Sequence, residues 1–231
     1  MAKLGIITGM LFEKGVLNAA ARSVPADRRP LIICCGLGRG AARKAAEEAV
    51  ANGATALLSF GISAGLDTRL QPGHVVAASY VHDGQKALLS DPAWTERLRE
   101  ELGRLCRVTC DPIAHAREVL MTPAEKAKVL TQTGASVADM ESYAVAEAAE
   151  AHGLPFATVR VVADTAHDTL PEVALSSTTP EGGVDVVKSV LGAIMHPGQI
   201  PGLIQLGRRT RIAQLEMRRL ADFGLPRSFF M

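Results

Sequence analysis

The chain has 231 residues, of which 48% are hydrophobic and 21% are charged, and its formal net charge is +1. This length fits one α/β domain with an ample core, and the composition is not that of a disordered chain. The near-zero charge and the aromatic content of 4% argue against a nucleic-acid-binding protein, which needs a basic surface or stacking rings. We therefore expect one domain over residues 1–231.

The cysteines and the N-terminus bear on compartment and metal binding. Cys34 and Cys35 are adjacent, whereas Cys106 and Cys110 lie far along the chain. Their spacing matches neither a zinc site nor a disulfide framework, so we expect buried, reduced thiols and no bound metal. The N-terminus lacks the long apolar region of a signal peptide, and no stretch reaches the roughly 18 apolar residues of a spanning helix. These features predict a cytoplasmic protein.

The first half of the chain predicts buried strands that are separated by helices. Apolar or β-branched strands are predicted over residues 3–8, 31–35, 55–60 and 74–81. The Gly-Leu-Gly-Arg-Gly run at residues 36–40 breaks the chain before a helix over 41–52, whose alanine, glutamate and lysine content favours that structure.

The second half adds helices over residues 91–105, 123–133 and 142–152, and strands over 135–140 and 156–163. Thr122 and Pro123 are placed to begin the second of these helices, and Gly153 is placed to end the third. Strands thus alternate with helices through connections that are too long for hairpins. This order predicts a three-layer α/β/α fold around a central mixed, twisted sheet.

Residues 184–231 are predicted to form a helical, basic amphipathic extension. A helix over 184–195 is ended by His-Pro-Gly, and a second helix follows over 200–223. Its leucines and isoleucines alternate with arginines at positions 208, 209, 211, 218 and 219. Two interpretations stay open, namely a helix that packs on the sheet with solvated arginines, or one that lies on a membrane surface.

Polar residues recur where the apolar strands end. The segment 5–10 leads to Glu13, the segment 61–65 carries Ser63, the segment 138–142 carries Glu141, and the segment 159–164 ends in Asp164. Ligands of open α/β sheets bind at such strand ends, so we expect one crevice with three acids and a glycine-lined hydroxyl. A carboxylate such as Glu141 can accept both hydroxyls of a ribose, beside an apolar surface from Met140.

These four segments, in this order and spacing, resemble the nucleoside phosphorylase/nucleosidase superfamily over residues 3–170, and within it the methylthioadenosine/adenosylhomocysteine nucleosidases. The resemblance implies hydrolysis of the adenine N-glycosidic bond of a 5′-substituted adenosine, without a cofactor and in a homodimer. It implies two catalytic residues, Glu13 to activate water and Asp164 to protonate the purine at N7. It also implies a set of substrate-binding residues: Ser63, Gly65, Leu120, Met121, Met140 and Glu141.

The chemistry of the bond agrees with these residue types. Cleavage builds positive charge on the sugar and negative charge on the base, which calls for an acid at the leaving group and a base at the water. Protonation of the departing adenine contributes about 10²–10⁴-fold in rate. Asp164 must therefore be protonated near neutral pH, and burial is what raises a carboxyl pKa to that range.

The sequence departs from the family pattern at three places. Ala163 stands where a hydroxyl residue usually orients the final acid, and the region of Leu120 and Met121 lacks an aromatic ring for the base. Phe60 stands near the position where phosphorolytic relatives carry a phosphate-binding arginine, and Arg39 is the one alternative phosphate ligand that we identify. These departures favour water over phosphate as the nucleophile.

The extended basic end resembles the nucleosidases of hopanoid lipid biosynthesis, which release adenine from adenosylhopane and leave ribosylhopane. We therefore expect a small nucleoside substrate, either free or lipid-linked, no nucleic-acid partner, and peripheral membrane contact through residues 200–223. The alternatives are a methylthioadenosine/adenosylhomocysteine nucleosidase or a phosphate-dependent purine nucleoside phosphorylase.

Two rival interpretations rest on single motifs, and a third rests on none. Residues 61–65 match the Gly-X-Ser-X-Gly elbow of serine hydrolases, with Asp164 and His167 as partners, but no helix is predicted directly after Ser63. The glycines of 36–40 lack the full dinucleotide-binding spacing. A non-catalytic nucleoside- or lipid-binding protein would keep its ligand without cleaving it.

Overall fold

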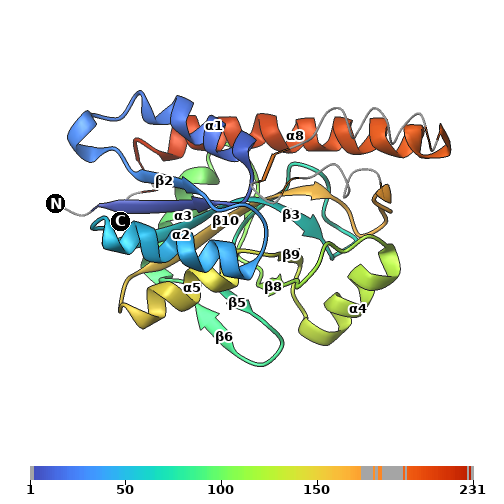
Figure 1. The fold of residues 1–231 in the computed structure, drawn as a ribbon, viewed down its shortest axis with the longest axis horizontal. Coiled ribbons are helices and arrows are strands. Elements are labelled where there is room, and N and C mark those ends of the chain that lie inside the picture. Colours follow the sequence, from blue (N-terminus) through green and yellow to red (C-terminus); the bar gives the residue numbers. More distant parts are fainter. Residues whose placement is uncertain are drawn as a thin grey trace.

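The computed structural model describes residues 3–172, 179, 182–183, 195, 197–227 and 229, which fold around one mixed sheet (Figure 1). The strands are β1 (Leu4–Thr8), β2 (Leu31–Cys34), β3 (Ala56–Gly65), β4 (Val75–Ala77), β5 (Tyr80–His82), β6 (Ala87–Leu89), β7 (Val108–Thr109), β8 (Ile113–His115), β9 (Val137–Asp139) and β10 (Phe156–Asp164). The helices are α1 (Leu11–Ala21), η1 (Ala26–Arg28), α2 (Arg39–Ala51), α3 (Pro92–Leu102), α4 (Pro123–Thr133), α5 (Ser142–Ala151), η2 (Pro197–Gln199) and α8 (Ile200–Gly224).

The two long strands β3 and β10 run parallel through the centre of the sheet. One edge of β3 is shared by two partners: β1 pairs with its first half up to Ser59, and β9 pairs with its end from Ala64. Between these points the edge of β3 has no strand partner among the described strands. The backbone at Gly61 and Ile62 is therefore open to side chains, and this opening becomes the floor of the site.

Helices cover both faces of the sheet, which confirms the predicted three-layer fold. Helices α1, α3 and α8 pack on one face and α2 and α5 on the other (Figure 1). Alternate residues of β3 point into the two layers, because successive side chains of a strand face opposite ways. Leu58 and Phe60 join the α1–α8 layer, whereas Leu57 joins the layer of small residues from α2 and α5.

Most predicted elements are present, with shifts that have local causes. Helix α4 begins where predicted, because Thr122 and Glu125 form a reciprocal capping box with 2.9 Å and 3.3 Å bonds. Gly153 ends α5 with a φ of 62°, which favours glycine. The single strand predicted over 74–81 is wrong. It splits into β4, which pairs with β10, and β5, which pairs with β6 and β8.

Helix α8 behaves differently along its length. Its second half is buried on the sheet through Ala213, Met217, Leu220 and Ala221, whereas its first half extends beyond the sheet core (Figure 1). The helix predicted over 184–195 lies outside the described residues except for Met195. No described helix is long and apolar enough to cross a membrane.

Candidate active site

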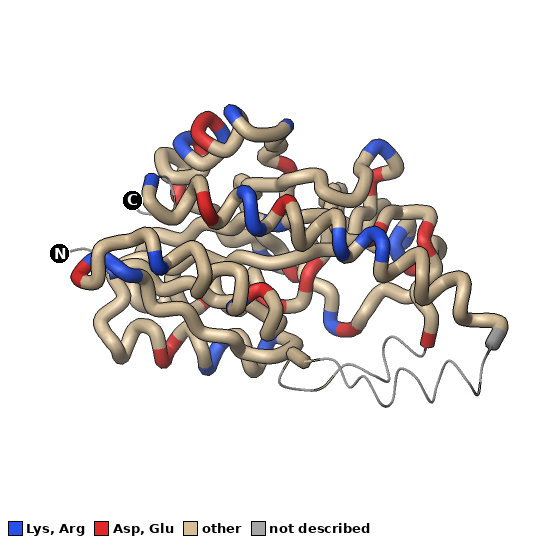
Figure 2. The backbone as a smooth tube through the Cα atoms, turned by 90° about the horizontal axis from the view of Figure 1, so that it is seen from above, with Lys and Arg blue, Asp and Glu red and all other residues tan. Residues whose placement is uncertain are grey.

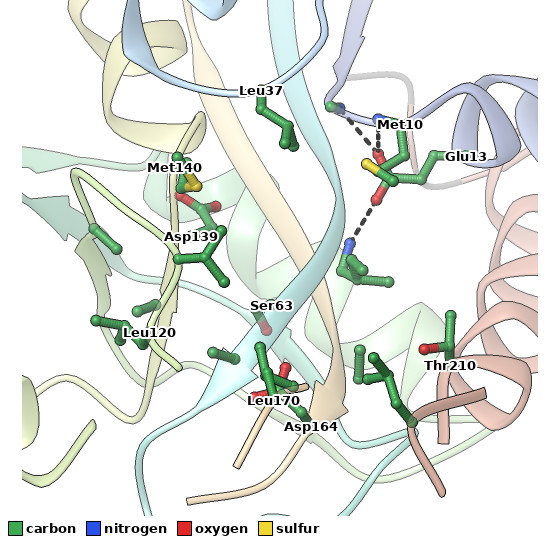
Figure 3. A pocket seen from close by; sticks show the side chains of 18 of the residues that line it. Met10, Glu13, Leu37, Ser63, Leu120, Asp139, Met140, Asp164, Leu170 and Thr210 are labelled. Carbon is green, nitrogen blue, oxygen red and sulfur yellow. Dashed lines mark hydrogen bonds between the residues drawn. The ribbon is translucent and has the colours of Figure 1, made fainter. Parts of the chain in front are cut away.

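A cavity of about 510 Å³ opens where β3, β9 and β10 end. Glu13, Glu141 and Asp164, which are distant in sequence, all line it. In Figure 3, Met10 and Glu13 lie on one side, Asp139 and Met140 face them, and Asp164 and Leu170 lie at the far end. Ser63 lies between these groups, and Thr210 of α8 forms a further wall. The structure therefore brings the predicted acids into one space.

Glu13 lies in the first turn of α1, and backbone N–H donors hold its carboxylate. Its Oε2 accepts from the N–H groups of Gly9 and Met10, both at 2.9 Å, and its Oε1 accepts from the N–H of Ile62 at 2.8 Å. The Ile62 donor lies where the edge of β3 opposite β10 has no partner among the described strands. Burial raises the pKa of Glu13, and the charge of Arg160 and these three N–H groups oppose that rise. A carboxylate of raised pKa is a better base toward water.

Gly61 is needed at this point for space rather than for its backbone angles. A Cβ there would lie 2.8 Å from Oε1 of Glu13 and closer still to the guanidinium of Arg160. Arg160 is the register partner of Gly61 on β10. The absence of a side chain at 61 therefore lets a buried cation and a buried acid meet over β3.

Glu141 lies at the start of α5 and reaches back to the glycine loop before α2. Its Oε1 accepts from the N–H of Gly38 at 3.0 Å, and a Cβ at Gly9 would lie 3.2 Å from its carboxyl carbon. Burial, and next the charge of Asp139, raise the pKa of Glu141 to about 7, against the lowering effect of Arg160. The loop at 36–40 thus donates a backbone hydrogen bond to a carboxylate of the protein itself.

A buried network under the cavity orients Arg160. Asp139 pairs with Nε of Arg160 and also accepts from the hydroxyl of Ser142. The guanidinium donates to the hydroxyls of Ser59 at 2.7 Å and Ser142 at 2.9 Å. Asp139 also accepts the backbone N–H of Ser142 at 3.1 Å, which caps the start of α5. The cation beneath the acids is therefore fixed by partners on two strands, β3 and β9, and on helix α5.

Asp164 has an orienting partner that the sequence did not reveal. Nζ of the fully buried Lys126 donates to its Oδ2 at 2.5 Å. Ala163 supplies no hydroxyl to Asp164, as the sequence indicates, and Lys126 is a different partner that the sequence did not reveal. Burial raises the pKa of Asp164, while the charge of Lys126 and then that of Arg209 act to lower it.

Ser63 and Gly65 have separate places at the end of β3. The buried hydroxyl of Ser63 lines the cavity and has no hydrogen-bond partner among the described residues, so it is open to a ligand. Gly65 does not line the cavity. A Cβ there would lie 3.0 Å from the carbonyl oxygen of Asp164, so its glycine permits the close approach of the two strand ends.

The apolar wall draws on more segments than predicted. Leu120, Met121 and Met140 line the cavity as expected, and the structure adds an aromatic side chain, Phe12 of α1. Leu170 also lines this wall, and its backbone N–H donates to the carbonyl of Met121 at 2.8 Å. The cavity lining thus includes an aromatic ring from a helix that is distant in sequence from Leu120.

One face of α8 closes the remaining side. Residues at helical spacing line the cavity there: Leu203, Leu206, Gly207, Thr210, Arg211 and Gln214. The sequence pattern predicted the helix but not that this face belongs to the site. Arg160, Asp139 and Lys126 were also missed, and only Arg160 gave a signal, as a charged residue in a strand of otherwise apolar character.

The sequence of the chain matches a known protein family. A sequence model described as the phosphorylase superfamily matches residues 12–181, well over half of the chain. The chain belongs to the phosphorylase superfamily. Comparison with curated protein sequences gave no significant match.

Solved structures share the phosphorylase-superfamily fold at low identity. The Campylobacter jejuni 5′-methylthioadenosine/S-adenosyl homocysteine nucleosidase has 15% identity and a TM-score of 0.74, with 98% of each chain covered. The Helicobacter pylori futalosine hydrolase has 14% identity and a TM-score of 0.67, covering 72% of this chain and 86% of that one. These similarities establish the fold of this superfamily member and leave its reaction to be argued from the site.

The structure contradicts the functions that two motifs would imply, namely the serine-hydrolase elbow at 61–65 and the dinucleotide-binding glycine run at 36–40. Ser63 lies inside β3, and residues 66–74 lead to β4 without a helix, so the serine-hydrolase elbow is absent. His167 is exposed, and Asp164 is paired with Lys126. The N–H of Gly38 is engaged by Glu141, so the glycine run does not present it to a dinucleotide.

Proposed function

We propose that the protein hydrolyses the N-glycosidic bond of a 5′-substituted adenosine and releases adenine. The observation that carries this proposal is the convergence of Glu13, Glu141 and Asp164 on one cavity, beside the free hydroxyl of Ser63. Glu13 takes a proton from the attacking water, Met140 and Glu141 bind the ribose, and Asp164 protonates N7 of the base. Leu120, Met121 and Phe12 provide apolar surface for the adenine ring.

Water is the nucleophile that the charges favour. The described residues lining the cavity include five acids, at 13, 118, 139, 141 and 164, and a single basic residue, Arg211. A phosphate dianion in such surroundings is disfavoured by like charge. Arg39, the alternative phosphate ligand, is held by both oxygens of Glu147 at 2.6 and 3.1 Å and by Asp83. This supports hydrolysis over phosphorolysis.

The substrate of this proposal is adenosylhopane, converted to ribosylhopane and adenine. The side of the cavity formed by α8 supports an apolar 5′ substituent, because Leu203, Leu206 and Gly207 line it and only Thr210, Arg211 and Gln214 add polar atoms. A nucleoside with a small 5′ group, such as methylthioadenosine, is the second candidate. The similarity of the fold to a nucleosidase of that name favours it.

The outward face of α8 supports contact with an anionic membrane surface. Three apolar residues of this face are about half exposed: Ile204 at 53%, Ile212 at 49% and Leu215 at 53%. Exposed arginines flank them at 208 and 218, and Arg211, which also borders the cavity, is exposed as well. Figure 2 views the molecule from the side that α8 covers, where basic positions recur along the helix. Such a surface suits a bilayer from which a lipid-linked nucleoside is drawn.

Product chromatography tests the reaction. In phosphate-free buffer we expect adenine and a free ribosyl product, and Asp164→Asn is expected to lower kcat by about 10²–10⁴-fold. Asp27→Asn, at an exposed carboxylate in η1, is the matched control. Strict dependence on phosphate would replace hydrolysis by phosphorolysis, and near-normal turnover in Asp164→Asn would overturn the acid assignment.

A further inference from the structure

Lys126 is a buried cation in a helix whose other residues are exposed or only partly buried. Its side chain has no exposed surface, and it is the one buried residue of α4. Fully buried lysines are rare unless their charge is paired. Lys126 does not line the cavity, so its contacts rather than direct access to a ligand must account for its position.

The ammonium group donates in three directions, and all three acceptors belong to the end of β10 and the loop after it. Nζ lies 2.5 Å from Oδ2 of Asp164, 2.7 Å from the carbonyl oxygen of Thr165 and 3.0 Å from that of Asp168. Three acceptors require three N–H donors, which a neutral amine cannot supply. The three N–H donors of an ammonium match these three acceptors, so its hydrogen-bonding capacity is fully used.

This contact leaves Asp164 with one oxygen for a ligand. Oδ2 is held by Lys126, so Oδ1 is the oxygen available to the cavity that Asp164 lines. Residue 163 is alanine and supplies no hydroxyl to orient the carboxyl. The neighbouring acid, Asp168, is occupied elsewhere, because its Oδ2 accepts from the N–H and hydroxyl of Thr165 and its Oδ1 pairs with Arg209.

We infer that Lys126 is the positioning residue of the acid step, which fixes the carboxyl of Asp164 and balances the charge that it acquires. This inference rests on the proposed function. As the bond from C1′ to N9 breaks, its electron pair passes to the base and the proton on Asp164 passes to N7. Neutral adenine leaves, and the new carboxylate faces an ammonium that is already in place. The water adds to C1′ and gives its proton to Glu13.

The inference has a consequence for the pH profile. Asp164 is faced by Lys126 from α4, Arg209 from α8 and Asp168 from the loop after β10. Burial raises the pKa of Asp164 and the charge of Lys126 lowers it. Since the acid must be protonated, activity is lost as pH rises through this pKa. Removal of the lysine charge should therefore extend activity to higher pH while it lowers the maximal rate.

The test compares Lys126→Gln with Lys128→Gln, an exposed lysine two residues along the same helix. For Lys126→Gln we expect kcat to fall at least about tenfold, within the range of acid catalysis, and the alkaline limb of kcat to move up by roughly one pH unit. Lys128→Gln should match the wild type. A folded Lys126→Gln protein with wild-type kcat and an unmoved limb would overturn the inference.

Two further experiments show how a loss of folding or of activity in Lys126→Gln is to be explained. If Lys126→Gln does not fold, Lys126→Ala is prepared with propylammonium, which can refill the buried position. Joint return of fold and turnover supports the inference, whereas return of the fold alone, or of neither, leaves Lys126 a structural residue and contradicts it. Asp164→Asn separates the two proposals, because an inactive Asp164→Asn with a normal Lys126→Gln removes only the role of Lys126.

Discussion

Arg160 is the residue that allows several acids to gather in one buried place. Its charge lowers the pKa of both Glu13 and Glu141, against the effect of burial. It is itself fixed by Asp139 and by the hydroxyls of Ser59 and Ser142. A buried charge is tolerated when it is paired and its hydrogen bonds are satisfied. The network under the cavity thus opposes the rise in pKa that burial causes in the two glutamates above it.

The pKa of Glu141, raised to about 7, predicts a pH dependence of binding. A ribose-binding carboxylate must be ionised to accept two hydroxyls, so KM should rise several-fold as pH falls through about 7. Glu141→Gln should have a high KM that varies little with pH, and Glu48→Gln, at an exposed site on α2, should match the wild type. Initial-rate measurements across the pH range test this, and an equal pH dependence of KM in Glu141→Gln would contradict it.

The raised pKa of Glu141 also affects folding stability, and this effect changes with pH in the opposite direction to the effect on binding. Folded Glu141 holds its proton more tightly than an unfolded glutamate of pKa 4.5, so this contribution to stability is present below that value and is lost as pH rises through about 7. The wild type should therefore lose on the order of 1–3 kcal/mol relative to Glu141→Gln between about pH 5 and pH 8. Thermal melts of both proteins measure the difference.

At the scale of elements, the sequence predicted the alternation of strands and helices because each element has its own local spacing of apolar residues. It could not show that one edge of β3 is unpaired at Gly61, since this depends on where β1 ends and β9 begins. It predicted the three acids because each follows an apolar strand. Lys126 gave no such signal, because a lysine in a helix is ordinary until the fold buries it.

Helix α8 acts as an element with two faces, and Gly207 probes the one at the cavity. A Cβ at Gly207 would meet no atom within 4 Å, so a larger side chain is accommodated without a backbone clash. Gly207→Phe should fill the space for a 5′ substituent. We expect turnover of a 5′-alkylthioadenosine with a long chain to fall at least about tenfold, while methylthioadenosine changes little.

The control for this substitution is Gly207→Ala, which also replaces the glycine and gains at least as much helix propensity without filling the cavity. Equal losses for both substrates in Gly207→Phe would mean that the residue affects the ribose or base region instead. No loss for either substrate would show that the 5′ substituent leaves the cavity by another side.

At the scale of the whole molecule, the arrangement of layers places the exposed face of α8 on the opposite side of the sheet from α2 (Figure 1). This separation provides a matched pair of charge reversals. Arg208→Glu/Arg218→Glu alters the proposed membrane face, and Arg43→Glu/Lys44→Glu makes the same change of net charge on α2. All four residues are exposed, and none of them lines the cavity.

We expect the wild type to sediment with vesicles of phosphatidylglycerol and not with those of phosphatidylcholine, with weaker binding at higher salt. Each basic residue near an anionic surface contributes about 1 kcal/mol, so the α8 reversal should weaken binding by at least about tenfold and the α2 reversal should weaken it far less. Turnover of methylthioadenosine should be unchanged in both, because the substrate is soluble. Equal binding by the two variants would contradict the membrane face.

Sedimentation equilibrium tests a second explanation of the exposed apolar residues of α8. If the α8 reversal converts a dimer into a monomer, these residues are covered by a second copy of the chain. The predicted homodimer, rather than the bilayer, then explains their exposure.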